Sequence, residues 1–430
     1  MSFPRYAKYK ASGVEWLGDV PEHWEIVRLK SLFQLASEKA TERLHPLGLE
    51  NIEGWSGRLI ETETVFEGDG VRFKAGDLLF GKLRPYLAKL HVAVTEGEAV
   101  GDFHVMRPKR PIRTRFSFYQ LIRREVIGLI DGSTYGAKMP RVGWDFLSDL
   151  PMVVPSSTEQ AKIIDFLDRE TAKIDGLVGE QERLIELLQE KRQAVISHAV
   201  TKGLDPHAPM KPSGVEWLGE VPANWDVISL KRVGTIKYGI GEPPEYHAEG
   251  TQLIRATNVD AGHIRPEGMV FIDPADLPEG RAIWLKAGDI IVVRSGAYTA
   301  DSAIIREDHL PAIAGFDMVI RPIACNPEFL QYVLLSFYLK NRQLDVEKLR
   351  AAQPHLNSEE LGSASLLLPP AREQAEIVRH LAALTSRVDT LIAETQRAIA
   401  LLQARRAALI SAAVTGQIDV RGLVAEAEAA

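Results

Sequence analysis

Residues 158–200 read TEQAKIIDFLDRETAKIDGLVGEQERLIELLQEKRQAVISHAV, and this stretch decides the fold. It has no proline and only two glycines, and its apolar residues recur at steps of three and four. That spacing puts them on one side of an α-helix, which indicates a long helix packed against another helix. The predicted contact positions are Ile163, Leu167, Ile174, Leu177, Leu184, Leu188 and Val195.

A second stretch with the same pattern follows 214 positions later. Residues 372–414 read REQAEIVRHLAALTSRVDTLIAETQRAIALLQARRAALISAAV, again with helical spacing. Two unrelated surface helices that each cover a core are the alternative, but they would not explain the matched register. We therefore expect the two helices to pack on each other. The predicted contact positions of the second helix are Ile377, Leu381, Leu384, Val388, Leu391, Ala398, Leu402 and Leu409.

The segment that precedes each domain is also repeated. SGVEWLGDVPEHWEIVRLKSL at 12–32 returns as SGVEWLGEVPANWDVISLKRV at 213–233, with 12 of the 21 aligned positions identical. The chain therefore reads as two tandem copies of leader, globular domain and long helix. In the first leader we expect Trp16, Leu17 and Trp24 to pack against the domain or the helices. A ligand platform is the alternative use of these aromatic side chains.

Between the leaders and the helices, short apolar runs separated by glycine-rich turns are typical of strands, and residues 116–130 read as a helix. We therefore predict an α+β fold. Ser157 or Thr158 is the expected N-cap of the first long helix. The predicted boundaries are 1–155 for leader and first domain, 156–201 for the central helix, 202–369 for linker, leader and second domain, 370–416 for the C-terminal helix, and 417–430 for a tail.

Composition sets limits on the class of protein. The chain is 45% hydrophobic and 25% charged, an ordinary balance for a soluble globular protein. Cys325 is the only cysteine, so we expect no intramolecular disulfide and no cysteine-based zinc site. The sequence has no apolar run of about 18 residues, so we expect a cytoplasmic protein that does not span a membrane.

The net charge of −7 argues against a nucleic-acid binder unless the positive charge is clustered. From Arg72 to Arg124 there are twelve Lys or Arg and four Asp or Glu, so this window carries 12 − 4 = +8. Clustered positive charge is typical of phosphate binding. A solvated basic face without a partner is the alternative interpretation.

Common catalytic motifs are absent from the sequence. The sequence has no P-loop, no E-x-K, no H-E-x-x-H and no G-x-S-x-G. Gly76–Asp77 and Gly288–Asp289 each precede an apolar strand, and we interpret these aspartates as turn-forming residues rather than catalytic ones. We predict a chain without catalytic residues, bound metal or cofactor.

With these motifs in place, the chain resembles the DNA-specificity subunits of type I restriction–modification systems. The resemblance rests on the leader S-G-V-E-W-L-G-x-V-P-x-x-W, the segments L-E-N-I-E and G-D-L-L-F-G-K-L-R-P-Y-L, the P-x-x-E-Q-x-x-I helix starts, and the two-copy layout. It implies two target-recognition domains that each read one half of a bipartite site in double-stranded DNA. It also implies that the two long helices pair as an antiparallel coiled coil, act as a spacer and dock two methyltransferase subunits.

The resemblance further implies partners that carry the chemistry. S-adenosylmethionine is expected on the methyltransferase subunits, and ATP on restriction subunits of the full complex. A helix of about 43 residues is about 65 Å long, which suits a spacer between two half-sites. Because the two domains differ in sequence, we expect the site to be gapped and asymmetric. A coiled-coil scaffold without sequence-specific DNA readout, or an enzyme whose catalytic domain has diverged, are the alternatives.

The candidate DNA contacts combine this resemblance with side-chain chemistry. Arg, Lys, Asn, Gln, Ser, His and Tyr in loops can bond base edges or phosphates. For His355, capping of a turn is an equally good interpretation. The candidates are Lys82, Arg84, Tyr86, Ser133, Thr134, Lys138 and Arg141 in the first domain, and Arg255, Asn258, Arg294, Ser295, Tyr298, Gln353, His355 and Asn357 in the second.

Overall fold

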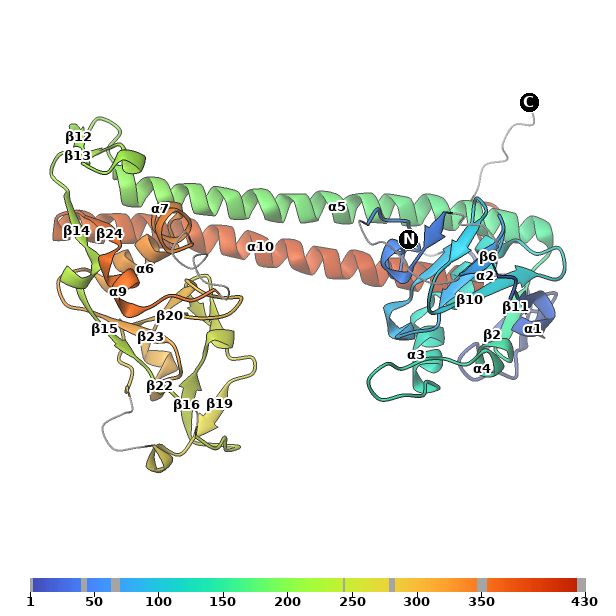
Figure 1. Ribbon diagram of the computed structural model, residues 1–430. Coiled ribbons are helices and arrows are strands. Elements are labelled where there is room, and N and C mark those ends of the chain that lie inside the picture. The colour runs from blue at the N-terminus through green and yellow to red at the C-terminus, as the bar shows by residue number, and fades with distance from the viewer. Residues whose placement is uncertain are drawn as a thin grey trace. The chain divides into compact units, whose positions relative to one another are not determined.

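The computed structural model describes residues 3–39, 45–62, 70–242, 244–277, 283–345 and 354–423. The chain forms two compact units. Unit 1 comprises Met1–Gln181 and Arg397–Ala430, and unit 2 comprises Glu182–Gln396. Each unit contains helices and sheets, which confirms the α+β prediction (Figure 1).

Unit 1 is built on an antiparallel four-stranded sheet of order β4-β10-β7-β8. A three-stranded sheet of order β5-β9-β6 accompanies it, and two helices, α2 and α3, follow β10. Short 3₁₀ turns, η1 and η2, lie between strands. The bounds are β4 Phe33–Leu35, β5 Pro46–Leu47, η1 Leu49–Asn51, β6 Val71–Phe73, β7 Leu78–Gly81, η2 Pro85–Leu87, β8 Leu90–Val92, β9 Gly97–Ala99, β10 Phe103–Pro108, α2 Thr114–Leu121 and α3 Arg124–Gly132.

Unit 2 repeats this topology. Its four-stranded antiparallel sheet has the order β15-β23-β20-β21, and its three-stranded sheet has the order β19-β16-β22. In both units the smaller sheet holds one parallel strand pair. The bounds are β15 Gly234–Tyr238, β16 Thr251–Ile254, η5 Ala256–Asn258, β17 Val259–Asp260, β18 His263–Ile264, β19 Val270–Ile272, η6 Pro274–Asp276, β20 Ile290–Val292, β21 Ser302–Ile304, η7 Glu307–His309, β22 Ala312–Ala314, β23 Met318–Pro322, α6 Pro327–Leu335, α7 Phe337–Leu339 and η8 Lys340–Leu344.

Each leader forms a hairpin and then a strand that pairs with the strand entering a long helix. In unit 1, β3 pairs with β11, and in unit 2, β14 pairs with β24. Trp24 and Leu17 are buried and Trp16 is half-buried against the same core, which confirms packing for the first leader. Trp225 is buried at the place equivalent to Trp24, whereas Trp217 of the second leader is 45% exposed. The bounds are β1 Tyr9–Ala11, β2 Asp19–Pro21, β3 Glu25–Arg28, α1 Leu29–Leu32, α4 Trp144–Ser148, β11 Pro151–Val154, β12 Met210–Pro212, η3 Glu216–Leu218, β13 Glu220–Pro222, β14 Asp226–Ser229, η4 Leu230–Arg232, α9 Ser358–Ser363 and β24 Ser365–Leu368.

The two long helices are α5, Ser157–Lys202, and α10, Ala371–Val414. In unit 1 the first part of α5 lies against the last part of α10, where Arg406 Nε donates to Asp175 Oδ1 at 2.8 Å. In unit 2 the last part of α5 lies against the first part of α10, where Arg192 Nε donates to Asp389 Oδ1 at 3.1 Å. The helices therefore contact each other and run antiparallel (Figure 1).

The apolar contacts of the pair follow the predicted positions only in part. Leu177, Leu184 and Leu391 are 46%, 42% and 48% exposed, so their prediction as contact positions was wrong. Their immediate neighbours Val178 and Ile185 are half-buried instead. At these steps two apolar residues are adjacent in sequence, and the second of the two faces the partner helix. The other predicted positions are buried or half-buried: Ile163, Leu167, Ile174, Leu188, Val195, Ile377, Leu381, Leu384, Val388, Ala398, Leu402 and Leu409.

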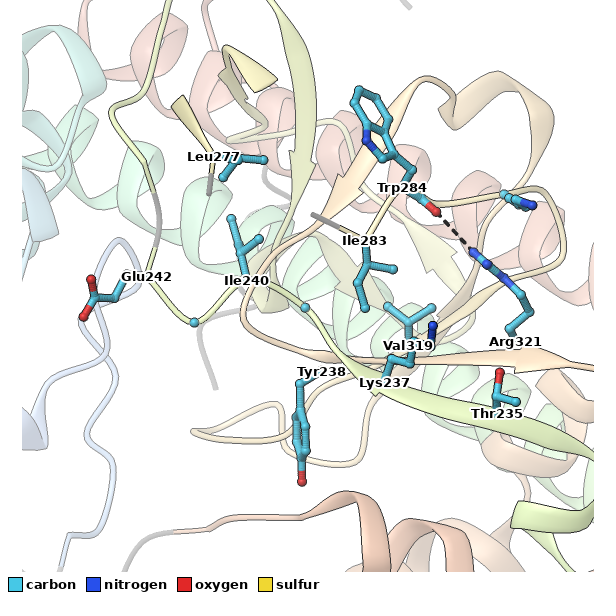
Figure 2. A pocket seen from close by; sticks show the side chains of 13 residues that line it. Thr235, Lys237, Tyr238, Ile240, Glu242, Leu277, Ile283, Trp284, Val319 and Arg321 are labelled. Carbon is cyan, nitrogen blue, oxygen red and sulfur yellow. Dashed lines mark hydrogen bonds between the residues drawn. The ribbon is translucent and has the colours of Figure 1, made fainter. Parts of the chain in front are cut away.

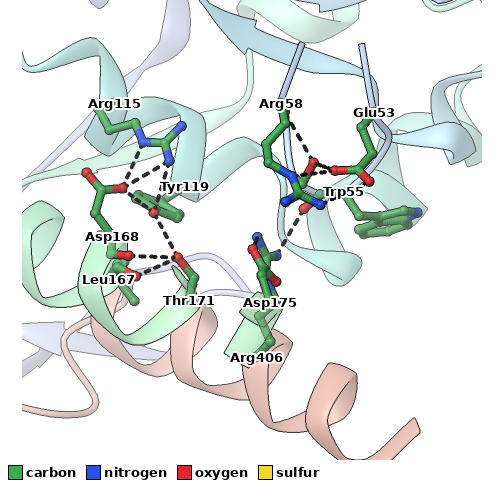
Figure 3. A network of polar contacts seen from close by, with 11 residues as sticks. Glu53, Trp55, Arg58, Arg115, Tyr119, Leu167, Asp168, Thr171, Asp175 and Arg406 are labelled. Atoms are coloured by element: carbon green, nitrogen blue, oxygen red, sulfur yellow. Dashed lines mark hydrogen bonds and ion pairs between the residues drawn. The ribbon is translucent and has the colours of Figure 1, made fainter. Parts of the chain in front are cut away.

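Unit 1 attaches to its part of the helix pair through polar side chains (Figure 3). Arg115 Nε and the Tyr119 hydroxyl both donate to Asp168 on α5. Arg406 on α10 reaches past Asp175 and donates from a terminal nitrogen to the carbonyl oxygen of Trp55 at 3.0 Å. Directional contacts of this kind fix how the domain sits on the helices of its own unit.

Two local predictions were wrong. Residues 116–130 form two helices rather than one, because Arg123 has extended backbone and starts α3, while its guanidinium lies over the Trp16 ring and donates to Ser411. The N-cap of α5 is Ser156 rather than Ser157 or Thr158. The Ser156 hydroxyl accepts from the Glu159 backbone nitrogen, and Glu159 accepts from the Ser156 backbone in return.

Candidate nucleic-acid interface

In unit 1, two loops that are far apart in sequence lie side by side. The loop after β7 contacts the loop before α4, with Leu83 bridging Arg141. Val142 N donates to Lys82 O at 3.0 Å, and Arg84 N donates to Pro140 O at 2.8 Å. The predicted candidates of the first domain are therefore brought together at one end of the main sheet.

Unit 2 builds the same arrangement from equivalent residues. The loop after β20 contacts the loop before α9, with Ser295 bridging His355. Leu356 N donates to Arg294 O at 2.8 Å, and Gly296 N donates to Pro354 O at 3.3 Å. We call each such arrangement a loop pair: residues 82–88 with 133–142, and residues 293–300 with 354–357.

The side chains of the first loop pair carry a partly neutralised charge cluster. Arg141 donates to both oxygens of Asp102 at 3.1 and 3.0 Å, and Lys82 Nζ lies 3.7 Å from the same carboxylate. Hydrogen bonds from Arg141 to Asp102 raise the pKa of the Arg141 guanidinium. Two cations face one anion, so the cluster keeps a net positive charge.

Other candidates of the first domain divide into two groups. Ser133 and Thr134 donate their hydroxyls to carbonyl oxygens of the last turn of α3, at 2.7 and 2.8 Å, so these hydroxyls retain only acceptor capacity. Arg84, Tyr86 and Lys138 are exposed. Within the described part of the chain their side chains have no hydrogen bond or ion pair, so they are the ones available to a ligand.

At the second loop pair, an arginine is stacked instead of being ion-paired. The Arg294 guanidinium carbon lies 4.6 Å from the centre of the Tyr238 ring and 4.2 Å from that of Phe316. Ser295 is half-buried, and Tyr298 is exposed beside it. Phe316 takes the place in the repeat that Asp102 holds in the first domain.

Asn258 was wrongly predicted as a DNA contact, because its side chain is 0% exposed. The amide oxygen accepts from Arg255 N at 3.2 Å, and the amide nitrogen donates to the carbonyl oxygens of Arg265 and Glu267. In unit 1, Asn51 accepts from Gly48 N in the same way, so the two asparagines hold equivalent turns. Both residues hold backbone turns.

Three further candidates of unit 2 have structural partners. Asn357 caps α9 by accepting from the backbone nitrogens of Glu359 and Glu360, so its amide oxygen is occupied. Arg255 donates to the carbonyl oxygen of Gly268 at 2.7 Å. His355 is half-buried and belongs to the bridge with Ser295. Gln353 lies outside the described residues.

The basic window is less positive than its sequence suggests. Arg107 is ion-paired with buried Asp77, Arg110 with Glu25, and Arg115 with Asp168. Two of these three partners come from outside the window of residues 72–124, so counting within the window overestimates the unpaired charge.

The two Gly-Asp motifs are structural, as the sequence predicted. Asp77 accepts from Lys74 N and pairs with Arg107. Asp289 accepts from Lys286 N and pairs with Arg321 at 2.6 Å in the same way. Both aspartates are 2% exposed, and their carboxylates are occupied by these structural partners.

The sequence analysis missed Tyr238 of β15 and a hollow on this side of unit 2. Unit 2 contains a hollow of about 1140 Å³, lined by residues of β15 and β23 and by Ile283, Trp284 and Lys286 (Figure 2). Tyr238 also lines it, but its ring extends away from the other lining side chains (Figure 2) and lies 4.6 Å from the Arg294 guanidinium carbon. Strand alternation places Lys237 and Tyr238 on opposite faces, but only a sheet order could have shown which face each meets.

The described residues contain neither a metal-binding cluster nor a membrane-spanning helix. No group of three or more His, Cys, Asp or Glu there could hold a metal ion. Among the helices described, none combines the length and apolar character needed to cross a membrane.

Comparison with known proteins gives consistent matches. A family model, the type I restriction modification DNA specificity domain, matches residues 222–400. The type I restriction enzyme MjaVIII specificity subunit of Methanocaldococcus jannaschii is 24% identical over 434 residues, covering 94% of this chain and 95% of that protein. The EcoKI specificity subunit of Escherichia coli K12 is 23% identical over 330 residues, covering 74% of this chain and 68% of that protein.

A solved structure from work on complex assembly and conformational transition of the type I R-M system shares the fold, with a TM-score of 0.70. It is 17% identical and covers 92% of this chain and 98% of its own. Fold and loop pairs thus define a tandem-repeat protein with one candidate recognition surface in each unit. The chain is thus similar over most of its length to specificity subunits of type I restriction enzymes, and residues 222–400 match the DNA specificity domain of these systems.

Proposed function

We propose that this chain is the sequence-specific DNA-binding subunit of a type I restriction–modification complex and is itself non-catalytic. The observation that carries the proposal is the repeated loop pair. Two equivalent sets of loops have the same backbone bonds but different side chains, Lys82, Asp102 and Arg141 in one and Arg294, Phe316 and His355 in the other. Loops with the same backbone and different side chains are suited to two different half-sites, each read in a groove of the DNA duplex.

The helix pair is proposed to set the gap between the half-sites and to dock two methyltransferase subunits. Leu177 and Leu391 occupy equivalent positions in the 214-residue repeat, and so do Leu187 and Leu401. All four side chains are exposed, at places where a soluble helix ordinarily presents polar residues. A repeated exposed apolar pair is suited to two copies of one partner. Ile196 is also apolar and lies off the predicted contact positions of its helix, but it is buried in unit 2 and cannot take this role.

Co-expression with the neighbouring methyltransferase subunit tests the proposal. Methylated adenines are mapped at single-base resolution on host DNA, with and without this chain. A gapped two-part motif that requires the chain is the expected result, and exchange of residues 34–155 should change only one half of it. Methylation with the same motif in the absence of the chain would favour a scaffold role instead.

The proposed spacer role has its own test. A heptad-compatible segment is inserted into α5 and a matching segment into α10, so that the helix pairing is retained. The motif should keep both half-sites and change its gap. An unchanged gap would show that the helix pair does not set the spacing.

A further inference from the structure

We infer that Arg294 is a specificity-determining residue that reads a guanine, with Tyr238 and Phe316 as positioning residues. The inference rests on the proposed function, and it adds the residue, the base and the mode of contact. Its starting point is the stack in which the Arg294 guanidinium lies against two aromatic rings at 4.6 and 4.2 Å.

The stack is built by three neighbouring strands of the main sheet of unit 2. Tyr238 pairs with Met318 in the ladder, and Met318 pairs with Val292. Two residues beyond these pairs, Phe316 and Arg294 extend the same face, because side chains alternate along a strand. The three side chains therefore form one row at the end of the sheet where the loop pair begins.

Both ends of the row are held in place. The Tyr238 hydroxyl accepts from Ser358 N at 2.7 Å, which fixes the ring against the start of α9. Arg294 N donates to Asp317 Oδ1 at 3.2 Å, and Arg294 O accepts from Leu356 N. Contact with two aromatic rings restricts the orientation of the guanidinium, so less freedom is lost when it binds a ligand.

The Arg294 guanidinium is oriented by the two rings, but its hydrogen-bond donors are not all paired. Its Nε atom is buried and has no hydrogen-bond partner, and among the described residues the terminal nitrogens form no hydrogen bond or ion pair. The buried carboxylate of Asp317 bonds the Arg294 backbone and attracts the guanidinium only at longer range. Tyr238 and Phe316 are nevertheless 40% and 44% exposed, so the stack lies at the surface. An arginine placed only for stability would be expected to pair with a carboxylate, as Arg321 does with Asp289 in the same sheet.

Guanine is the base that fits this group. A planar guanidinium bonds O6 and N7 of guanine through two parallel donors in the major groove, and the other bases lack this pair of acceptors. A phosphate would also accept two bonds, but phosphate contact carries no sequence information. The equivalent place in unit 1 has Lys82 and Arg141 paired to Asp102, so the inference applies to the half-site read by unit 2 alone.

The test is methylation mapping with the co-expressed complex carrying Arg294→Lys, which keeps the charge and loses the fork. We expect one G·C position in one half of the motif to relax by about 10- to 100-fold, while the other half is unchanged. Phe316→Leu should relax the same position to a smaller extent. Arg342→Lys is the matched control, since Arg342 is exposed and lies over the Phe337 ring elsewhere in unit 2.

Every outcome bears on the inference. An unchanged motif with Arg294→Lys would overturn it while leaving the proposed function intact, whereas a wild-type complex without a bipartite motif would refute the proposed function first. If Arg294→Lys abolishes methylation, binding to the cognate duplex and to duplexes with single base changes decides the question. Uniform weakening on all duplexes identifies a phosphate contact and overturns the inference, and loss of discrimination at one G·C pair supports it.

Discussion

Arg192 on α5 donates from Nε to Asp389 on α10 at 3.1 Å, and the repeat-equivalent residues form the same bond with their helices exchanged. Asp175 lies 214 positions before Asp389, and Arg406 lies 214 positions after Arg192. The Asp175–Arg406 bond in unit 1 is 2.8 Å long. Duplication thus produced two equivalent cross-links, each of which fixes the antiparallel register of its part of the helix pair.

Reversal of one of these ion pairs should be tolerated only when both partners change. Arg192→Glu or Asp389→Arg alone places like charges together at a partly buried site and should cost about 1–3 kcal/mol of unfolding free energy. The double variant should recover most of this loss, because the attraction is restored. Chemical denaturation measures the coupling. Reversal of the exposed pair Arg372–Glu376 is the control, and its coupling should stay below about 0.5 kcal/mol.

The contribution of Glu159 to the free energy of unfolding should depend on pH. Burial alone would raise the pKa of its carboxyl, but hydrogen bonds from His23 and Ser156 hold the pKa below its usual value of 4.5. A pKa that is lower in the folded state stabilises the fold above the usual value, and this contribution is lost as the pH falls through the folded-state pKa. Glu159→Gln should therefore cost about 1–2 kcal/mol at pH 7 and progressively less in acid.

Denaturation of this variant and of wild type between pH 3 and pH 7 checks the expectation. Exposed Glu50 provides the control, and Glu50→Gln should leave stability unchanged across the range. A stability difference for Glu159→Gln that stayed constant down to about pH 3 would contradict the assignment.

Asp289 should matter for stability and not for sequence preference. Its carboxylate is buried and holds Arg321, whose other hydrogen bond goes to the Trp284 carbonyl oxygen. Asp289→Ala removes the charged partner and should destabilise unit 2 by about 1.5–3 kcal/mol. The exposed pair Asp260–Arg265 is the comparison, and Asp260→Ala should cost less than about 1 kcal/mol. At a temperature where Asp289→Ala remains folded, its methylation motif should match wild type. A changed motif would mean that the Gly-Asp turn takes part in recognition.

Lys138 should contribute affinity without sequence information. It is exposed in the first loop pair and has no ion pair within the described residues, which suits a phosphate contact. Lys138→Ala should weaken binding to cognate and non-cognate duplexes by the same factor and reduce the slope of log affinity against log salt by about 1. Titrations at several salt concentrations measure both. Exposed Lys10 of the leader is the control, and a loss of affinity confined to the cognate duplex would identify Lys138 as a base contact.

The sequence predicted the features that depend on repetition and local spacing. The two long helices and the duplicated leaders followed from comparing one half of the chain with the other. The buried Gly-Asp turns also followed, since glycine and aspartate before an apolar strand are typical of a turn.

Features that depend on tertiary contacts could not be predicted in the same way. Leu177 and Val178 are both apolar, so the spacing permits two helix registers and only the packed pair selects one. Asn258 looks like a base reader in a loop, yet its amide is consumed by a turn that the sequence does not reveal. Tyr238 and Phe316 meet Arg294 only because their strands are neighbours in the sheet.

The backbone bonds of the two loop pairs have a consequence for how new specificities arise. Leu356 N to Arg294 O and Val142 N to Lys82 O are the same bond, and neither involves a side chain. The chain can therefore exchange Asp102 for Phe316, or Arg141 for His355, between its copies without altering the frame that presents them. Under the proposed function, selection acts on two independently variable faces of one inherited scaffold, so that a single gene changes half of the sequence it recognises while the other half stays as it was.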